Sequence, residues 1–426
     1  GFNNVPLVRP VPLVDALVVW AVVLGLPAWW RLRRLPVVRR LLFWVSLLST
    51  VVALRLIVDL PVHGLWAARD ALFALELWIV FPAIAAGYAL GMRRLERRLG
   101  WLFALAIAWF LLYPLRFDLQ DLGPVVGIQR PVPLFAFTTA GFVALPAFFW
   151  FLWRRAGGAG LIGAGAALVV LLFAQSRGSY LAWLLSLLVM LALRPGAGRH
   201  VGRFAVVGAV ASVAIVLMGP VTGRLGEPLG LGTVIEQMGS LLGREGPGAG
   251  SFAHRLEAWP VTVAQVLAEP LGPLVGIGLG VDLFQGFSVS EGVLVRKPHN
   301  DFLEIWARTG IVGLLAWLGI LATLGFAALR GLRAEGRHAW VVALQVVLGI
   351  TALSQPAFGF AYITVVYAGL TGLWLGAWLR EGGLAPMVRR RGMAGAGARA
   401  SGSSSWPSAQ GVGWLTGHGV GPPYGG

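Results

Sequence analysis

The densest cluster of polar side chains in the sequence runs from Arg296 to Asp301 and continues with Glu304 and Arg308. At its centre is His299, directly after a proline. Histidine is the side chain that most readily exchanges a proton near neutral pH, so His299 is the best general-base candidate in the chain. Pro298 suits the start of a helix, which would place His299 in the first turn. A histidine that only hydrogen-bonds at a helix cap is the alternative that the spacing leaves open.

A metal site is the less favoured interpretation of the same cluster. The His-Glu-x-x-His pattern is missing, and no second histidine lies four residues after His299. Asp301 and Glu304 keep a divalent cation open as an alternative. The preceding Gly276 to Gly280 segment matches neither a P-loop nor a dinucleotide-binding loop, because no Gly-Lys-Ser/Thr follows, and it predicts a flexible connector. We therefore expect neither a metal nor a cofactor.

Two arginines far from this cluster also lie where chemistry could occur. The break at 175–179 divides the 34 residues from 160 to 193, because one helix of that length would be about 51 Å long and exceed a bilayer core. Arg177 then lies in a tight turn at the membrane edge. Arg255 lies on or near the polar side of a helical pattern, whose apolar positions are Phe252, Leu256, Trp259, Val263, Val266 and Leu267. An Arg255 that simply faces water or lipid headgroups is the alternative.

The composition places all of these residues in a membrane protein. Of 426 residues, 57% are hydrophobic and 12% charged, with a mean hydropathy of +0.77, whereas a soluble domain has about 25% charged residues. This excludes a soluble enzyme, a secreted disulfide scaffold and a disordered polymer. Runs that are apolar on every face, such as 161–173, exclude a β-barrel. The net charge of +16 would suggest nucleic acid in a soluble protein, but its placement along the chain points to membrane lipids instead.

Apolar runs separated by arginine clusters predict an all-α, polytopic integral membrane bundle of eleven or twelve spans. An additional first helix before residue 1 would give the even count. The expected spans are near 11–30, 41–60, 71–91, 100–115, 134–153, 160–175, 179–193, 204–220, 310–329, 339–356 and 360–379.

Arginine placement predicts the sidedness of the bundle. The alternate loops 31–40, 93–98, 154–155, 194–203 and 330–337 carry five, four, two, three and three arginines. The intervening short loops carry fewer basic residues, so the positive-inside rule places the arginine-rich loops in the cytoplasm. The long segment before His299 then faces the outside.

Four domains follow from this topology. We expect a first transmembrane bundle of about eight spans over 1–220, one large outer helical loop with two helical patterns over 221–301, and a second bundle of about three spans over 302–380. Long loops of this kind usually carry function. Residues 381–426 are rich in Gly, Ser, Ala and Pro and predict a disordered cytoplasmic tail.

Charged residues within the expected spans form a second, smaller group. Asp15, Arg55, Asp59 and Glu76 are costly in a membrane unless each faces another helix or a wet cavity. Arg55 and Asp59 are four residues apart and should pair with one another. A proton relay is the alternative, and Glu76 has no obvious local partner.

Three of the motifs described above resemble those of a known family. The segment from His299 to Leu314, which reads HNDFLEIWARTGIVGL, is similar to the signature of the bacterial O-antigen ligase and O-antigen polymerase superfamily. Arg177 in Ser-Arg-Gly-Ser resembles that family's arginine in a short outer turn, and Arg255 in HRLEAW resembles the arginine of its large outer loop. The order of the three motifs also matches. The histidine motif and the long loop before it are the specific elements, since the arginine motifs are weak alone.

The resemblance implies a metal-independent, inverting glycosyltransferase that moves a glycan from polyprenyl (undecaprenyl) diphosphate to an acceptor hydroxyl on the outer side. Arg177 and Arg255 would bind the diphosphate, with Arg296 and Lys297 in support, because guanidinium groups can stabilise the charge that develops on this leaving group. His299 would orient or deprotonate the acceptor hydroxyl. Asn300 and Asp301 would position it.

Two questions remain open from the sequence. A ligase attaches finished glycan to a lipid A-core-like acceptor, whereas a polymerase extends a lipid-linked glycan, and no motif distinguishes them. The rival class is a transporter or flippase for lipid-linked sugar that uses Arg55, Asp59 and Glu76 as a polar path. No convincing repeat relates the two halves, and the polar groups concentrate toward the outer face, so the enzyme is favoured.

Overall fold

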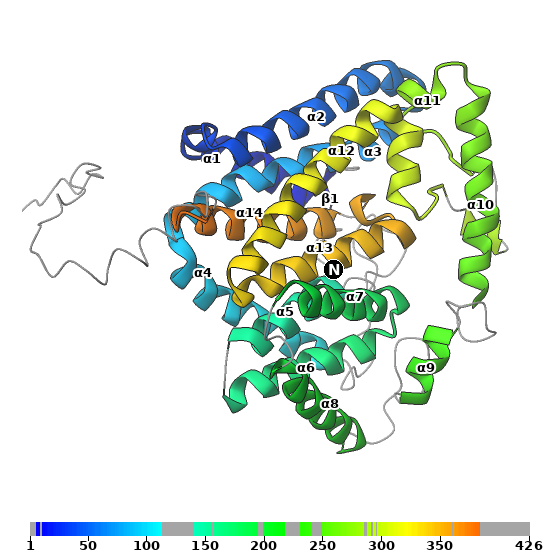
Figure 1. Cartoon of the computed structure of the whole chain (residues 1–426). Coiled ribbons are helices and arrows are strands. Elements are labelled where there is room, and N and C mark those ends of the chain that lie inside the picture. The colour runs from blue at the N-terminus through cyan, green and yellow to red at the C-terminus, as the bar shows by residue number, and fades with distance from the viewer. Residues whose placement is uncertain are drawn as a thin grey trace, which may run out of the picture. The chain divides into compact units, whose positions relative to one another are not determined.

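The computed structural model describes residues 6–8, 11–112, 140–154, 157–194, 199–217, 231–239, 249–284, 288–290, 293–294, 296–359 and 361–383. Most of these residues are helical, which confirms the predicted all-α membrane fold (Figure 1). Residues 384–426 of the tail expected over 381–426, and the side chains of His254 and Arg255, lie outside what the structure describes.

The helices follow the predicted order of spans. Their bounds are α1 Leu13–Leu32, α2 Pro36–His63, α3 Leu65–Glu76, α4 Val80–Leu111, α5 Gly141–Arg154, α6 Gly158–Ala174, α7 Arg177–Leu193, α8 Arg199–Leu217, α9 Leu231–Gly239, α10 Ala249–Ala268, α11 Gly272–Val275, α12 Asp301–Ala334, α13 Ala339–Ser354 and α14 Ala361–Arg380. Helices α9 and α10 correspond to the two helical patterns expected in the long loop. Two short antiparallel hairpins were not predicted: β1 (Pro6–Val8) with β2 (Val11–Pro12), and β3 (Ser288–Ser290) with β4 (Val293–Leu294).

Among the described residues, five helical segments are long and apolar enough to cross a membrane, and four further apolar helices are shorter. One of the five joins α3 and α4 over 47 residues, from Leu65 to Leu111. Gly91 interrupts it with φ 69° and ψ 164°, just before the arginines of 93–98. The segment therefore contains two spans with a break between them. The break lies beside the arginine cluster, where the sequence predicted the end of one span and the start of the next. The chain is a multi-pass membrane protein.

The helix that follows His299 is broken in the same way. Gly310 in α12 has φ 67° and ψ −170°, so the nine residues from Asp301 form a separate limb before the long span begins. A Cβ atom at Gly310 would collide with the carbonyl of Leu274, and one at Gly276 would collide with the backbone of Arg308. Only glycine allows this close approach with this backbone conformation. The break thus fixes the limb that carries Glu304 and Arg308 against α11.

Replacing Gly310 by alanine should destabilise the protein by at least about 2 kcal/mol, because a left-handed residue gains a Cβ that also clashes with Leu274. Gly325→Ala on the same helix is the matched control, since a Cβ there meets nothing within 4 Å and alanine favours a helix. Unfolding in detergent, followed by circular dichroism, measures both. Equal stability of the two variants would contradict the packing described here.

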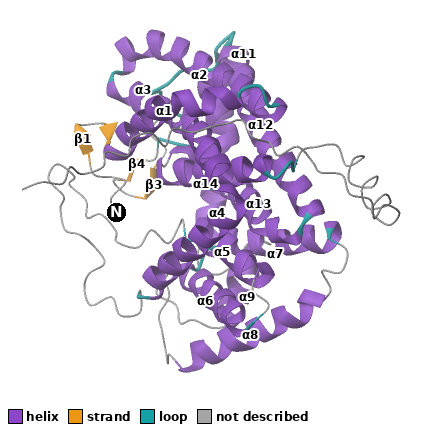
Figure 2. Cartoon of the chain, turned by 90° about the vertical axis from the view of Figure 1, so that its left-hand side faces the viewer, coloured by secondary structure: helices purple, strands orange, loops and turns teal. Residues whose placement is uncertain are grey.

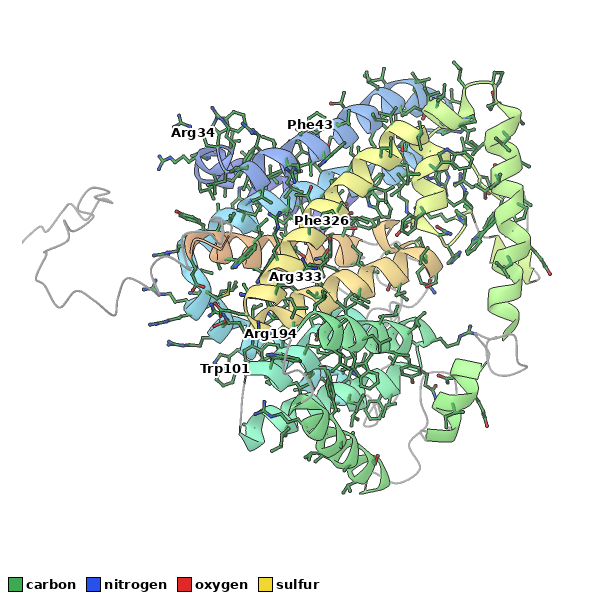
Figure 3. All side chains as sticks on the ribbon, in the orientation of Figure 1. Arg34, Phe43, Trp101, Arg194, Phe326 and Arg333 are labelled. Carbon is green, nitrogen blue, oxygen red and sulfur yellow. The ribbon has the colours of Figure 1, made fainter. Side chains whose placement is uncertain are left out.

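The arginine-rich turns gather at one end of the helices. Arg337 pairs with Glu96 at 3.6 Å and with Glu381 at 2.9 Å, and Arg194 donates to the carbonyl of Arg333 at 3.0 Å. Figure 3 places Arg34, Arg194 and Arg333 toward the same side of the view. We call this end, with the segments 33–40, 93–98 and 333–338, the arginine-rich end. The shared location is what the predicted topology requires of these loops.

Three helices, α4, α13 and α14, lie at the centre of the fold. In Figure 2, α14, α4 and α13 lie between the group of α1, α2, α3 and α12 and the group of α5, α6, α7 and α8. The backbones of α4 and α14 are in close contact, because a Cβ atom at Gly87 or Gly376 would collide with the facing helix. Small residues allow such contact between membrane helices. Helix α10 runs crosswise to α13 and α14 in Figure 1, as expected of a helix at the membrane surface.

Candidate active site

His299 lies in a strained turn directly before α12. Its φ of 51° is in the left-handed region, which side chains rarely adopt. Helix α12 begins only at Asp301, and the Asn300 side chain accepts a hydrogen bond from the Leu303 N–H at 3.2 Å. The expectation that His299 lies in the first helical turn is therefore wrong. Asn300, a favoured N-cap residue, caps the helix, so His299 lies outside it.

The imidazole of His299 is oriented by the backbone of its own segment. Its Nδ1 lies 3.0 Å from the carbonyl oxygen of Lys297. A carbonyl can only accept, so Nδ1 carries the proton in this contact and Nε2 is the ring nitrogen with the lone pair in the neutral form. This is the tautomer that a general base acting through Nε2 needs.

Four charged side chains form a closed network beside His299. Lys297 pairs with Asp70 at 3.3 Å and with Glu304 at 2.9 Å, and Arg308 pairs with Asp70 at 2.8 Å and with Glu304 at 3.0 Å. We call these residues the charge quartet. Its two positive and two negative charges balance, which is what burial of charge in a protein interior requires.

The segment from Gly276 to Gly280, which precedes the cluster, is hydrogen-bonded to acidic side chains of α2 and α3. Asp59 accepts a hydrogen bond from the Leu279 N–H at 2.7 Å, and Asp70 accepts one from the Gly280 N–H at 3.0 Å. Gly276, Gly278 and Gly280 all have positive φ. The expectation of a flexible connector is wrong, because these residues are buried against α2, α3 and α12.

Acidic residues of α2 and α3 thus position a loop more than two hundred residues later. Arg55 pairs with Asp59 at 3.2 Å, so the predicted i, i+4 ion pair is confirmed. Arg296 donates to the Gly280 carbonyl, and its guanidinium lies 4.1 Å from the centre of the Trp66 ring. Glu76 of α3 and Asp15 of α1 are both buried and interact electrostatically.

Asp301 connects the cluster with the turn between α13 and α14. Its carboxylate, 1% exposed, accepts a hydrogen bond from the Phe358 N–H at 3.1 Å. The same turn is close to Lys297, whose Nζ is 3.0 Å from a Cβ placed on Gly359. Asp301 therefore has a structural contact that the sequence did not predict.

Arg177 lies at the same end of the helices as this cluster. It is half-buried at the first position of α7, where the Ser176 side chain accepts from the Ser179 N–H. Gly178 faces Ile350 and Ser354 at the last turn of α13, and the turn that follows contacts Asp301. The predicted break between the two spans is confirmed at Gln175 and Ser176, with Gln175 in a left-handed conformation, but Arg177 begins α7 instead of lying within the turn.

Helix α10 brings the third motif toward His299. The Trp259 Nε1 donates to the Pro298 carbonyl at 2.8 Å, and Thr262 donates to the Leu283 carbonyl at 2.9 Å. Arg255 occupies the helix position one turn before Trp259. The buried positions are Ala258, Thr262 and Val266, whereas Leu256 and Leu267 are 48% and 62% exposed, so the expected apolar face is only partly the buried one.

The structure therefore brings Asn300, Asp301, Arg296 and Lys297 around His299 and docks the helix of Arg255 beside them. The sequence analysis did not single out Asp70, and it named Arg308 in the polar cluster without a role. The spacing of Glu304 and Arg308 was a usable signal, since residues four apart on a helix pair readily. Nothing near Asp70 in the sequence indicates its partners.

The chain is similar in sequence to known proteins of polysaccharide production. Over 287 residues the chain is 30% identical to the Exopolysaccharide production protein ExoQ of Rhizobium meliloti (strain 1021), an alignment that covers 61% of this chain and 59% of that protein. Residues 162–318 match the O-antigen ligase family, and this region contains Arg177, Arg255 and His299. These two matches support the resemblance found in the sequence, to the superfamily of O-antigen ligases and polymerases.

Proposed function

We propose that this protein is a membrane glycosyltransferase of polysaccharide biosynthesis that transfers a glycan from polyprenyl diphosphate to an acceptor hydroxyl. The observation that carries the proposal is the arrangement of His299. Its Nδ1 donates a hydrogen bond to the Lys297 carbonyl, and Arg177 and the helix of Arg255 lie at the same end of the fold. The family match over these residues supports the same reaction class.

In the proposed reaction, Nε2 of His299 takes the proton of the acceptor hydroxyl. The acceptor oxygen then forms a bond to the anomeric carbon while the bond from that carbon to the diphosphate oxygen breaks. Attack from the opposite face inverts the anomeric centre, and polyprenyl diphosphate leaves. Arg177 and Arg255 stabilise the charge on the leaving diphosphate, since arginine forks bind phosphate oxygens without a metal.

The supporting residues divide between binding and positioning. Lys297 is charge-balanced by Asp70 and Glu304, so its main role in this proposal is to hold the backbone carbonyl that orients His299. Asn300 and Asp301 also help to position His299. Asn300 does so by capping α12, and Asp301 by its hydrogen bond to the turn between α13 and α14. Arg296, on the Trp66 ring, is the nearer candidate for a supporting diphosphate contact.

Two acceptors are consistent with the family. The O-antigen ligase match favours transfer to a lipid A-core-like acceptor. The relative named as an exopolysaccharide production protein favours the second candidate, a polymerase whose acceptor is itself a lipid-linked glycan. Both use the same donor chemistry, and in both the site would face the periplasmic side of the bacterial inner membrane.

The experiment offers each acceptor separately to the purified protein in liposomes with a polyprenyl-diphosphate oligosaccharide, and reads the product by mass. Ligation adds one donor glycan to a lipid A-core acceptor, whereas polymerisation gives a ladder of lipid-linked products. If no donor is consumed while lipid-linked sugar crosses the bilayer, the transporter replaces the enzyme.

A further inference from the structure

A cavity at the arginine-rich end has no part in the proposed reaction. Its volume is about 1080 Å³, and it lies between the second half of α4, the end of α5 and the start of α6. From α4 it is lined by Arg93, Glu96, Arg97, Gly100 and Trp101. These positions recur at intervals of three and four residues, so one face of α4 forms this wall.

The wall from α4 carries positive charge into the cavity. Arg93 and Arg97 are exposed and lie one turn apart on the same helix face. Glu96, the acidic residue among the described lining residues, is buried and pairs with Arg337 at 3.6 Å. The described lining therefore has two exposed arginines against one buried carboxylate, so its net charge is positive.

The opposite wall offers hydrogen-bond donors. Helix α6 begins here, and its N-cap residue Gly157 has no side chain to satisfy the first N–H groups. Such a helix start attracts anions. Gly157 and Gly158 leave open space around it, since a Cβ at either meets nothing within 4 Å.

A second donor in the lining also lacks an acceptor. Trp150 is 4% exposed, and among the described residues its buried Nε1–H has no hydrogen-bond partner. A buried indole N–H usually has a partner, because leaving it unsatisfied is costly. An oxygen-rich group within the cavity would provide one.

The surface beside the cavity indicates the rest of the ligand. Trp101, Leu105 and Ile162 follow the arginines and the glycines along α4 and α6, and they are 69%, 68% and 67% exposed. Exposed apolar side chains on membrane helices face acyl chains. The charged cavity and the apolar surface are therefore continuous, which suits a molecule with an anionic head and lipid tails.

We infer that this cavity binds the phosphate headgroup of an anionic phospholipid. Arg93 and Arg97 pair with the phosphate, the start of α6 donates to its oxygens, and the acyl chains lie along Trp101, Leu105 and Ile162. Basic cavities between membrane helices recognise anionic headgroups in this way. The site is separate from His299, at the other end of the helices.

The test uses the full chain, purified in detergent and titrated with phosphatidylglycerol or phosphatidylcholine, with bound lipid counted by native mass spectrometry. The double variant Arg93→Gln and Arg97→Gln should bind phosphatidylglycerol at least about ten-fold more weakly than the native chain. Arg94→Gln with Arg98→Gln is the matched control, because it removes the same charge from the same exposed turns but not from the cavity lining. The control should bind phosphatidylglycerol like the native chain.

A third variant separates binding from folding. Gly158→Glu places a carboxylate in the first turn of α6, where it favours the helix, and it should abolish the preference for phosphatidylglycerol while leaving thermal stability intact. Equal binding by the two arginine double variants would overturn the proposal. So would competition by glycerol phosphate or inorganic phosphate at the lipid's own concentration, since that result would identify a site for soluble phosphate.

Discussion

Replacing Arg308 by methionine should lower the free energy of unfolding by about 3–5 kcal/mol, the cost of removing one partner from a buried ion pair. Arg308 is 2% exposed and contacts both acidic members of the charge quartet. Methionine fills much of the same volume, so the loss reflects the unbalanced carboxylates of Asp70 and Glu304 more than a cavity. Unfolding in detergent by heat or by a denaturing detergent measures the change.

The matched control is Arg330→Met on the same helix, where the side chain is exposed and the expected change is within about 0.5 kcal/mol. Asp70→Asn combined with Arg308→Met should cost less than the sum of the single substitutions, because the two residues contact each other. If Arg308→Met unfolds like Arg330→Met, the quartet does not hold this part of the fold.

Replacing His299 by alanine should reduce the rate of glycan transfer by about 10²–10⁴-fold, the usual contribution of a general base. The loss should appear in kcat, with thermal stability unchanged, because the His299 side chain is only half-buried and the α12 cap belongs to Asn300. Initial rates with a polyprenyl-diphosphate donor measure it.

His299→Gln distinguishes proton transfer from orientation. The glutamine amide can hydrogen-bond the acceptor hydroxyl but cannot take its proton. We expect this variant to be nearly as slow as His299→Ala. Recovery of most of the native rate by glutamine would mean that His299 only orients the acceptor.

Much of the fold could be predicted from hydrophobic runs and arginines. The break near Gly91 was indicated by the arginines that follow it, and the span expected to begin at 310 does begin at the Gly310 break. Local spacing also predicted the Arg55–Asp59 pair and the helix break just before Arg177. These features depend on residues close in sequence, whose interactions follow from helix geometry.

The parts that could not be predicted depend on long-range contacts. Asp70 lies at the end of an expected span, and nothing near it indicates that it binds Lys297, Arg308 and the Gly280 N–H. The glycines of 276–280 suggested a flexible segment, because the contacts with α2 and α3 that fix their conformation are distant in sequence. The left-handed backbone of His299 likewise depends on the Asn300 cap and the Lys297 pairs.

In the proposed reaction arginine, without a metal, stabilises the leaving diphosphate at the end of the fold opposite the arginine-rich end. The most direct measurement is the initial rate of glycan transfer in EDTA by the native chain, Arg177→Gln and Arg34→Gln, which is an exposed arginine at the other end. We predict that transfer by the native chain and Arg34→Gln survives EDTA, whereas Arg177→Gln loses it. Loss of native transfer in EDTA, or normal transfer by Arg177→Gln, would contradict the account.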